Sequence, residues 1–180
     1  MSILKRISHW MGADQEMTHI VAGNIAPGFS LNSLDGAEFS LATAMSRGPV
    51  VAAFFKVSCP VCQFTFPFLQ RIYTRYASAA ATMVGISQDD SPATKKFAAQ
   101  YGVTFPMLLD TEDYPVSNAY GLTNVPTIFL IDTDGTVKVS AMGFDKQALE
   151  DLARELAERA KQTISPLFLS TEKVPAHKPG

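Results

Sequence analysis

Residues 50–62 read VVAAFFKVSCPVC, which is an apolar run of six residues, a three-residue link and two cysteines two residues apart. An apolar run without polar interruption is typical of a central parallel strand that is covered on both faces. Beyond it, aromatic and aliphatic side chains recur at helical spacing, which predicts a helix over residues 60–79 with a kink at Pro67. We therefore expect the motif Cys59-x-x-Cys62 to lie where a buried strand ends and a helix begins.

On either side of this stretch, the hydrophobic pattern predicts further strands and helices. The expected strands span residues 29–34, 39–41, 82–87, 105–110, 127–132 and 137–141. The further helices are expected over residues 92–101 and 113–121 and after Asp145. Strands that alternate with helices, followed by a hairpin and a last helix, describe one three-layer α/β domain. We predict a mixed central sheet with helices on both faces and an N-terminal β-hairpin.

The composition fits a packed globular domain and offers no charge-based reason for a polyanionic partner. Apolar residues make up 47% of the 180 residues and charged residues 18%, which excludes disorder along the whole chain. With 15 basic and 17 acidic side chains, the formal net charge is −2. No stretch approaches the ~20 apolar residues of a membrane span. We therefore expect neither nucleic acid nor a membrane as the main partner.

The two ends of the chain differ in pattern from the part between them. Residues 1–24 are weakly amphipathic, and residues 164–180 contain three prolines and no periodicity. We interpret them as an N-terminal leader and an extended or loose C-terminal tail, on either side of one domain over residues 25–163. The leader carries no apolar stretch long enough for the core of a signal peptide, which predicts a cytoplasmic location.

The position of the two cysteines predicts a redox site. At the start of a helix, free backbone N–H groups and the positive end of the helix dipole favour the thiolate form of Cys59, which makes it the expected nucleophile. Cys62 lies one turn further along, less exposed but close enough to form a disulfide with Cys59. It is therefore the expected resolving thiol, which releases a mixed disulfide by attacking the Cys59 sulfur. Pro60 presets the first helical turn, and this chemistry requires no metal, flavin or nucleotide.

Two other interpretations of the cysteine pair remain. The pair is half of a zinc site if the other ligands come from the three histidines of the chain, which are His9, His19 and His177. Because these histidines lie in the leader and the tail, we expect no metal site. The second interpretation is a pair of buried, inert cysteines, which the position between strand and helix disfavours.

Several features around the motif resemble the thioredoxin superfamily. They are the apolar run 50–55, the motif Cys59-Pro60-Val61-Cys62, the helix residue Pro67 and the segment Val125-Pro126-Thr127 ahead of a strand. The opening segment 26–36 and the segment 105–132 are more similar to its redoxin branch, which groups AhpC/TSA-like proteins with thioredoxin-like thiol–disulfide oxidoreductases. The resemblance covers roughly residues 25–160.

The resemblance implies a cis peptide bond between Val125 and Pro126, in a loop that faces the cysteines and presents backbone groups to the bound partner. It also implies that Pro60 and Val61 contact the substrate together with that loop. The substrate is then a disulfide-containing protein or small molecule. An external dithiol or disulfide, such as thioredoxin or its reductase, returns the pair to its starting state.

Peroxide-reducing relatives suggest a second function, a thiol peroxidase with an antioxidant role, but the residues that shape a peroxide pocket do not match. In those relatives a proline stands seven residues, and a threonine or serine three residues, before the peroxidatic cysteine. Before Cys62 those positions hold Phe55 and Cys59. Before Cys59 they hold Ala52 and Lys56. Thiol peroxidase therefore stays the alternative, and a non-enzymatic redox-sensing or binding module is the third hypothesis.

The chain also departs from thioredoxins. Their buried acid, which assists the resolving cysteine, aligns with Ala53, and the tryptophan before their first cysteine aligns with Ser58. The proton acceptor for Cys62 is therefore unidentified. We interpret most of the nearby acids as turn and capping residues, and an acid contributed by this region stays open as an alternative. These acids are Asp89, Asp90, Asp110 and Glu112. The sequence as a whole predicts a thiol–disulfide oxidoreductase.

Overall fold

The centre of the molecule is a five-stranded sheet. It is seen in a computed structural model, which describes residues 19–77 and 80–180. The strands are β3 (Val50–Phe55), β4 (Thr82–Ser87), β5 (Met107–Leu109), β6 (Thr127–Ile131) and β7 (Val137–Met142). They are ordered β5-β4-β3-β6-β7. β3, β4 and β5 run parallel, whereas β6 is antiparallel to β3 and β7 to β6. The predicted mixed sheet is confirmed.

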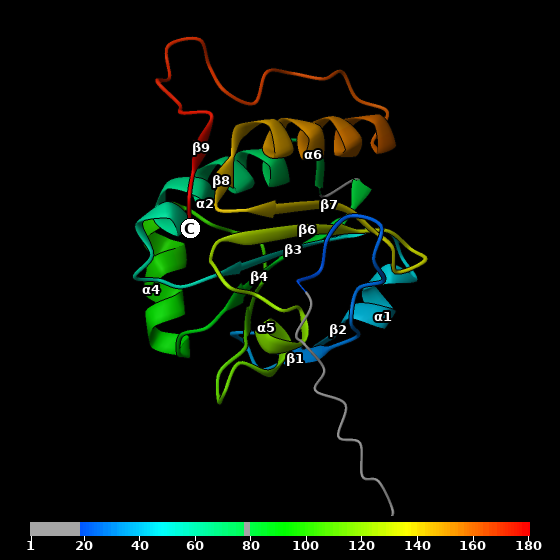
Figure 1. The fold of residues 1–180 in the computed structure, drawn as a ribbon, viewed down its shortest axis with the longest axis vertical. Helices are drawn as coiled ribbons and strands as arrows, with labels where there is room; N and C mark the ends of the chain where they lie inside the picture. The colour runs from blue at the N-terminus through cyan, green and yellow to red at the C-terminus, as the bar shows by residue number, and fades with distance from the viewer. Residues whose placement is uncertain (1–18, 78–79) are drawn as a thin grey trace, which may run out of the picture.

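Helices cover both faces of this sheet, as Figure 1 shows. One face is covered by α2 (Pro60–Ile72), α4 (Ser91–Tyr101) and α6 (Lys146–Arg159). The other face packs against α1 (Leu41–Met45), α5 (Pro115–Ala119) and the hairpin of β1 (Ser30–Asn32) and β2 (Glu38–Ser40). The fold is therefore the predicted three-layer α/β arrangement with an N-terminal β-hairpin.

The central strand β3 explains why its sequence is apolar throughout. All six of its residues are buried. Its odd-numbered residues pack into the cluster beneath α2 and α6, and its even-numbered residues pack into the cluster beside α1 and α5. A strand with apolar neighbours on both faces has no place for a polar side chain. The chain leaves this buried strand at Phe55 and starts α2 at Pro60, so the cysteine motif lies at the edge of the core.

Two predicted helices differ from the structure at their ends. The helix expected over residues 60–79 is α-helical only to Ile72 and continues as a π-helical turn, η1 (Tyr73–Ala77). The helix expected over residues 113–121 is shorter, because residues 112–114 have positive φ angles and the regular turns start at Pro115. Left-handed backbone of this kind cannot be part of an α-helix.

The tail beyond α6 is extended and is held against the rest of the molecule. Leu167 and Phe168 are buried in the cluster beneath α2 and α6. Further along, β9 (His177–Lys178) pairs with β8 (Phe144–Asp145). In Figure 1 the tail passes along the outer side of α6 and descends as β9 to the C mark beside α2. The end of the described chain is thereby brought back to the sheet.

Within residues 19–77 and 80–180, no helix has the length and apolarity needed to cross a membrane. Most of the expected leader lies outside the described residues, because these begin at residue 19.

Candidate active site

The two cysteines lie at the N-terminus of α2, where β3 has just ended. Cys59 is the N-cap residue of the helix, with extended backbone angles, and Pro60 occupies the first helical position. The backbone N–H of Cys62 donates to Cys59 Sγ at 3.3 Å. The Cys59 sulfur therefore receives one of the free N–H groups at a helix start, where the dipole favours negative charge.

The two thiols have different surroundings. Cys59 is half-buried, between the exposed residues Ser58 and Pro60, whereas Cys62 is buried. Burial raises the pKa of the Cys62 thiol well above its ordinary value, and the charges of Cys59 and Asp89 add to the effect. The Cys59 sulfur is thus the more accessible of the two, while burial favours the protonated form of Cys62.

A loop from the start of β6 lies directly beside Cys59. The Val125–Pro126 peptide bond in this loop is cis. Cys59 Sγ donates to the carbonyl oxygen of Val125 at 3.3 Å. The loop is held by Gly143, whose backbone N–H donates to the Pro126 carbonyl oxygen at 2.8 Å. Residues more than 60 positions apart in the sequence therefore meet at one sulfur atom.

Asp89, one of the acids that the sequence did not mark as catalytic, lies next to the cysteine motif. It follows β4, and its Oδ2 accepts from the backbone N–H of Val57 at 2.7 Å. The carboxylate thereby holds the link between β3 and the cysteines. The signal was the parallel pairing of β3 and β4, since the carboxyl ends of parallel strands meet at one edge of a sheet.

Two of the other acids act as caps, in line with their interpretation from sequence. Asp90 is the N-cap of α4 and accepts from the N–H of Ala93. The buried Asp110 accepts from the backbone N–H groups of Val116 and Ser117 at the start of α5. None of these hydrogen bonds joins Asp90 or Asp110 to a cysteine.

A groove of about 320 Å³ flanks the Val125 loop. Its lining includes Lys56, Gln88, Tyr114 and Asn124 as well as Val125. Lys56 lies over the Tyr114 ring, with its Nζ 5.7 Å from the ring centroid. The groove therefore offers polar and aromatic surface next to the loop that contacts Cys59.

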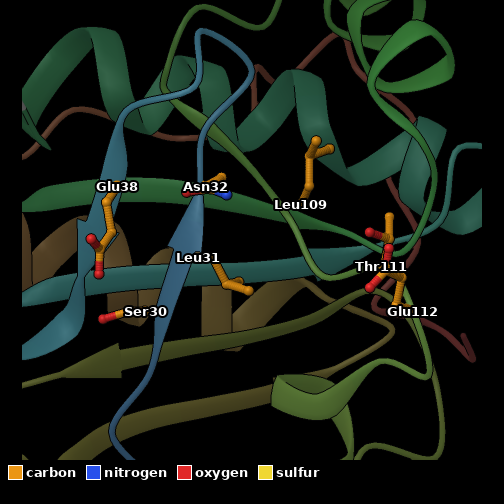
Figure 2. Close-up of a pocket in the computed structure, with 7 residues that line it drawn as sticks. All are labelled: Ser30, Leu31, Asn32, Glu38, Leu109, Thr111 and Glu112. Atoms are coloured by element: carbon orange, nitrogen blue, oxygen red, sulfur yellow. The ribbon is translucent and has the colours of Figure 1, made fainter.

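Another cavity, of about 350 Å³, lies between the N-terminal hairpin and the end of β5. Figure 2 shows its lining, with Ser30, Leu31 and Asn32 on β1 opposite Leu109, Thr111 and Glu112. Neither cysteine and no residue of the Val125 loop is part of this lining. This cavity is therefore separate from the two cysteines.

The zinc interpretation gains no support from the described residues. Within residues 19–77 and 80–180, no three His, Cys, Asp or Glu side chains lie close enough together to hold a metal ion. His9 lies outside the described residues.

Comparison with known proteins assigns the family. Residues 22–140 match the family model described as the AhpC/TSA family. The chain belongs to the AhpC/TSA family. Among curated members with similar sequences, the thiol–disulfide oxidoreductase ResA of Geobacillus thermodenitrificans is 32% identical over 142 residues, which are 78% of this chain and 79% of the relative.

Solved structures show the same thioredoxin-like architecture. A putative thiol:disulfide interchange protein DsbE from Chlorobium tepidum has a TM-score of 0.68 and 25% identity, over 79% of this chain and 99% of that one. The peroxidoxin BcpB of Mycobacterium tuberculosis has a TM-score of 0.65 and 26% identity, over 78% and 97%. The relatives named as oxidoreductases support thiol–disulfide oxidoreductase as the activity, with peroxidase secondary.

The expectation of a cytoplasmic location is wrong. A secreted disulfide oxidoreductase of Mycobacterium tuberculosis, homologous to Escherichia coli DsbE, matches with a TM-score of 0.59 and 26% identity over 72% of this chain and 95% of that one. Together with the ResA and DsbE relatives, it points away from the cytoplasm. The expectation rested only on the lack of an apolar stretch in the leader. That lack carries no information about the chemistry of the cysteine site. A half-buried cysteine beside a buried one suits disulfide exchange in an oxidising compartment as well.

Proposed function

We propose that the chain exchanges disulfides with its substrates through Cys59 as the nucleophile and Cys62 as the resolving thiol. The arrangement at the start of α2 carries this proposal, because the accessible sulfur receives a helix N–H and the second thiol is buried one turn away. Such an arrangement assigns the attack on the substrate disulfide to one thiol and the release of the substrate to the other.

In the first step the Cys59 thiolate attacks one sulfur of the substrate disulfide. A bond forms between Cys59 Sγ and that sulfur, the substrate S–S bond breaks, and the leaving thiolate takes up a proton. Cys62 then loses its proton, and its thiolate attacks Cys59 Sγ. The Cys59–Cys62 disulfide forms and the second substrate thiol leaves. The substrate has gained two electrons and two protons, and an external dithiol of the thioredoxin kind reduces the pair again.

The residues around Cys59 supply the contacts for the substrate chain. Pro60 is exposed, and Val61 and Val125 are half-buried beside the sulfur. We assign these three residues to substrate contact through their side chains and, at Val125, through the backbone. Pro126 is buried and contributes by shaping the loop.

Reduction of insulin disulfides with dithiothreitol as the electron donor tests the assignment. The wild-type protein should accelerate the reaction and Cys59→Ser should not. Cys62→Ser should turn over much more slowly than the wild type, because dithiothreitol must then release each mixed disulfide in place of Cys62. Ser58→Ala, at the exposed neighbouring position, is the matched control and should keep the wild-type rate. Equal rates for Cys59→Ser and the wild type would overturn the proposal.

A thiol peroxidase is the second candidate, because a peroxidoxin shares the fold at 26% identity. The two cysteines lack the preceding proline and hydroxyl residue expected of a peroxide pocket, since Phe55 and Cys59 precede Cys62 at those positions. We therefore expect the reduced protein to consume hydrogen peroxide much more slowly than insulin disulfides.

A further inference from the structure

We propose that residues 175–180, here called the strap, occupy the edge on which an extended substrate chain pairs beside Cys59. Protein disulfides must then displace the strap, whereas small disulfides need not. The proposal rests on the proposed function and adds to it a competition between this chain's own backbone and that of the substrate.

The strap is held by backbone pairing to β8 and to the first residue of α6. Within it, β9 pairs antiparallel with β8, so that Lys178 lies opposite Phe144 and His177 opposite Asp145. The N–H of Lys146 donates to the carbonyl oxygen of Ala176 at 2.9 Å. The strap is thus an extended segment bound as a β-strand, which is the form in which a substrate polypeptide would bind a strand edge.

The end of the strap lies against the loop beside Cys59. Asn124 Nδ2 donates to the carbonyl oxygen of Gly180 at 3.0 Å. A Cβ placed on Gly180 would lie 2.5 Å from the carbonyl oxygen of Val125. That oxygen is the same atom that accepts the bond from Cys59 Sγ. The strap therefore covers the backbone of the residue that carries the substrate-pairing edge.

Gly143 allows the strap to pass close to this loop. Its φ is +70°, a left-handed value that favours glycine. A Cβ there would collide with the carbonyl oxygen of Lys178 and would lie 2.9 Å from the nitrogen of Gly180. The N–H of Gly143 donates to the Pro126 carbonyl oxygen. One glycine thus joins the Val125–Pro126 loop on one side and the strap on the other.

The covered edge and the accessible sulfur predict different effects on large and small substrates. Cys59 stays half-exposed with the strap in place, so a small disulfide reaches its sulfur. A polypeptide that pairs with Val125 finds its edge free only in the fraction of molecules whose strap is displaced. Its apparent affinity is lowered by that fraction.

Two variants release the strap without changing the cysteines or the loop. Deletion of residues 175–180 removes it. Gly180→Ala leaves its length unchanged but forces its end away from Val125, because the new Cβ collides with the carbonyl oxygen. Gly28→Ala is the matched control, since a Cβ at Gly28 meets nothing within 4 Å. The Gly180→Ala variant keeps the test valid if the deletion destabilises the fold.

The experiment compares kcat/KM for insulin with kcat/KM for the small aromatic disulfide 5,5′-dithiobis(2-nitrobenzoate). We expect both variants to raise kcat/KM for insulin by roughly threefold or more, since a few hydrogen bonds of ordinary strength hold the strap. The value for the small disulfide should stay within twofold of the wild type, and Gly28→Ala should change neither. Unchanged insulin kinetics in both variants, or an equal gain with both substrates, would overturn the proposed role of the strap. A wild-type protein that reduces neither substrate would instead overturn the proposed function.

Discussion

At Cys59 and Cys62, one helical turn separates a thiol that partners can reach from a thiol that they cannot. The first sulfur accepts the N–H of Cys62 and donates to Val125. The second is buried, and that burial raises its pKa. The pair is therefore asymmetric by position, without an acid in the place where thioredoxins carry one. In the proposed reaction, release of the mixed disulfide then depends on how readily Cys62 gives up its proton.

This dependence sets the pH profile of the resolving step. Below its pKa, the thiolate fraction of a thiol rises tenfold per pH unit, and Cys62 starts from a pKa above its ordinary value of 9.0. The rate at which Cys62 releases a preformed mixed disulfide should therefore rise about tenfold per pH unit from pH 6 to pH 9 with no plateau. Stopped-flow fluorescence on a mixed disulfide with a labelled peptide measures it. A plateau near neutral pH would contradict this prediction.

Asp89 offers a second test at this scale. Its charge acts to raise the pKa of Cys62, though less than burial does. In Asp89→Asn the side-chain oxygen still accepts from Val57, so the link keeps its anchor, while the charge is lost. We expect the same profile displaced to lower pH, so that resolution at pH 7 is modestly faster. Asp90→Asn, at the cap of α4, is the control. A slower resolving step in Asp89→Asn would instead identify Asp89 as the proton acceptor.

Among the elements, the unit of β3, the cysteine motif and α2 could be predicted because each part has a local signal. An unbroken apolar run indicates a strand buried on two faces, and the helical spacing that follows indicates α2. The end of α2 could not be predicted, since the π-helical turn of η1 has no signature in spacing. The contact of Asp89 with Val57 also had no local signal, because it joins two loops that only the sheet brings together.

The tail contacts were equally beyond prediction. The ion pair between Arg71 and Glu172 joins residues 101 positions apart, with Arg71 also donating to the Leu167 carbonyl oxygen. A segment with three prolines and no periodicity gives no sign of which surface it covers. The structure shows that α2 and its Arg71 hold the tail.

Loss of this anchor should release the tail. In Arg71→Ala, we expect faster hydrogen exchange over residues 167–174, while Arg47→Ala, at an exposed position just after α1, should leave that exchange unchanged. The pair with Arg71 lowers the pKa of Glu172 from 4.5 to about 2. Its contribution is therefore complete above pH 4.5 and is lost as the pH falls through about 2. Wild-type protection that disappears already near pH 4 would contradict this assignment.

For the molecule as a whole, the fold brings two separate segments to one sulfur atom and a third against the loop beside it. They are the start of α2, the loop before β6 and the strap, and they come from the first third, the later part and the end of the described chain. The sequence was enough to predict the first two, because the cysteine motif and the segment at Val125 carry recognisable patterns. The strap depends on packing between distant segments, and its sequence shows no pattern of its own.

The central claim is that substrates are held through Cys59 and released by Cys62. The most direct test is to mix the reduced Cys62→Ser variant with oxidised insulin and to locate the covalent adduct by mass spectrometry of its proteolytic peptides. We predict a stable disulfide between Cys59 and an insulin cysteine, which the wild-type protein does not accumulate and Cys59→Ser does not form. A stable adduct on Cys62 in the Cys59→Ser variant, or no adduct in either variant, would contradict the claim.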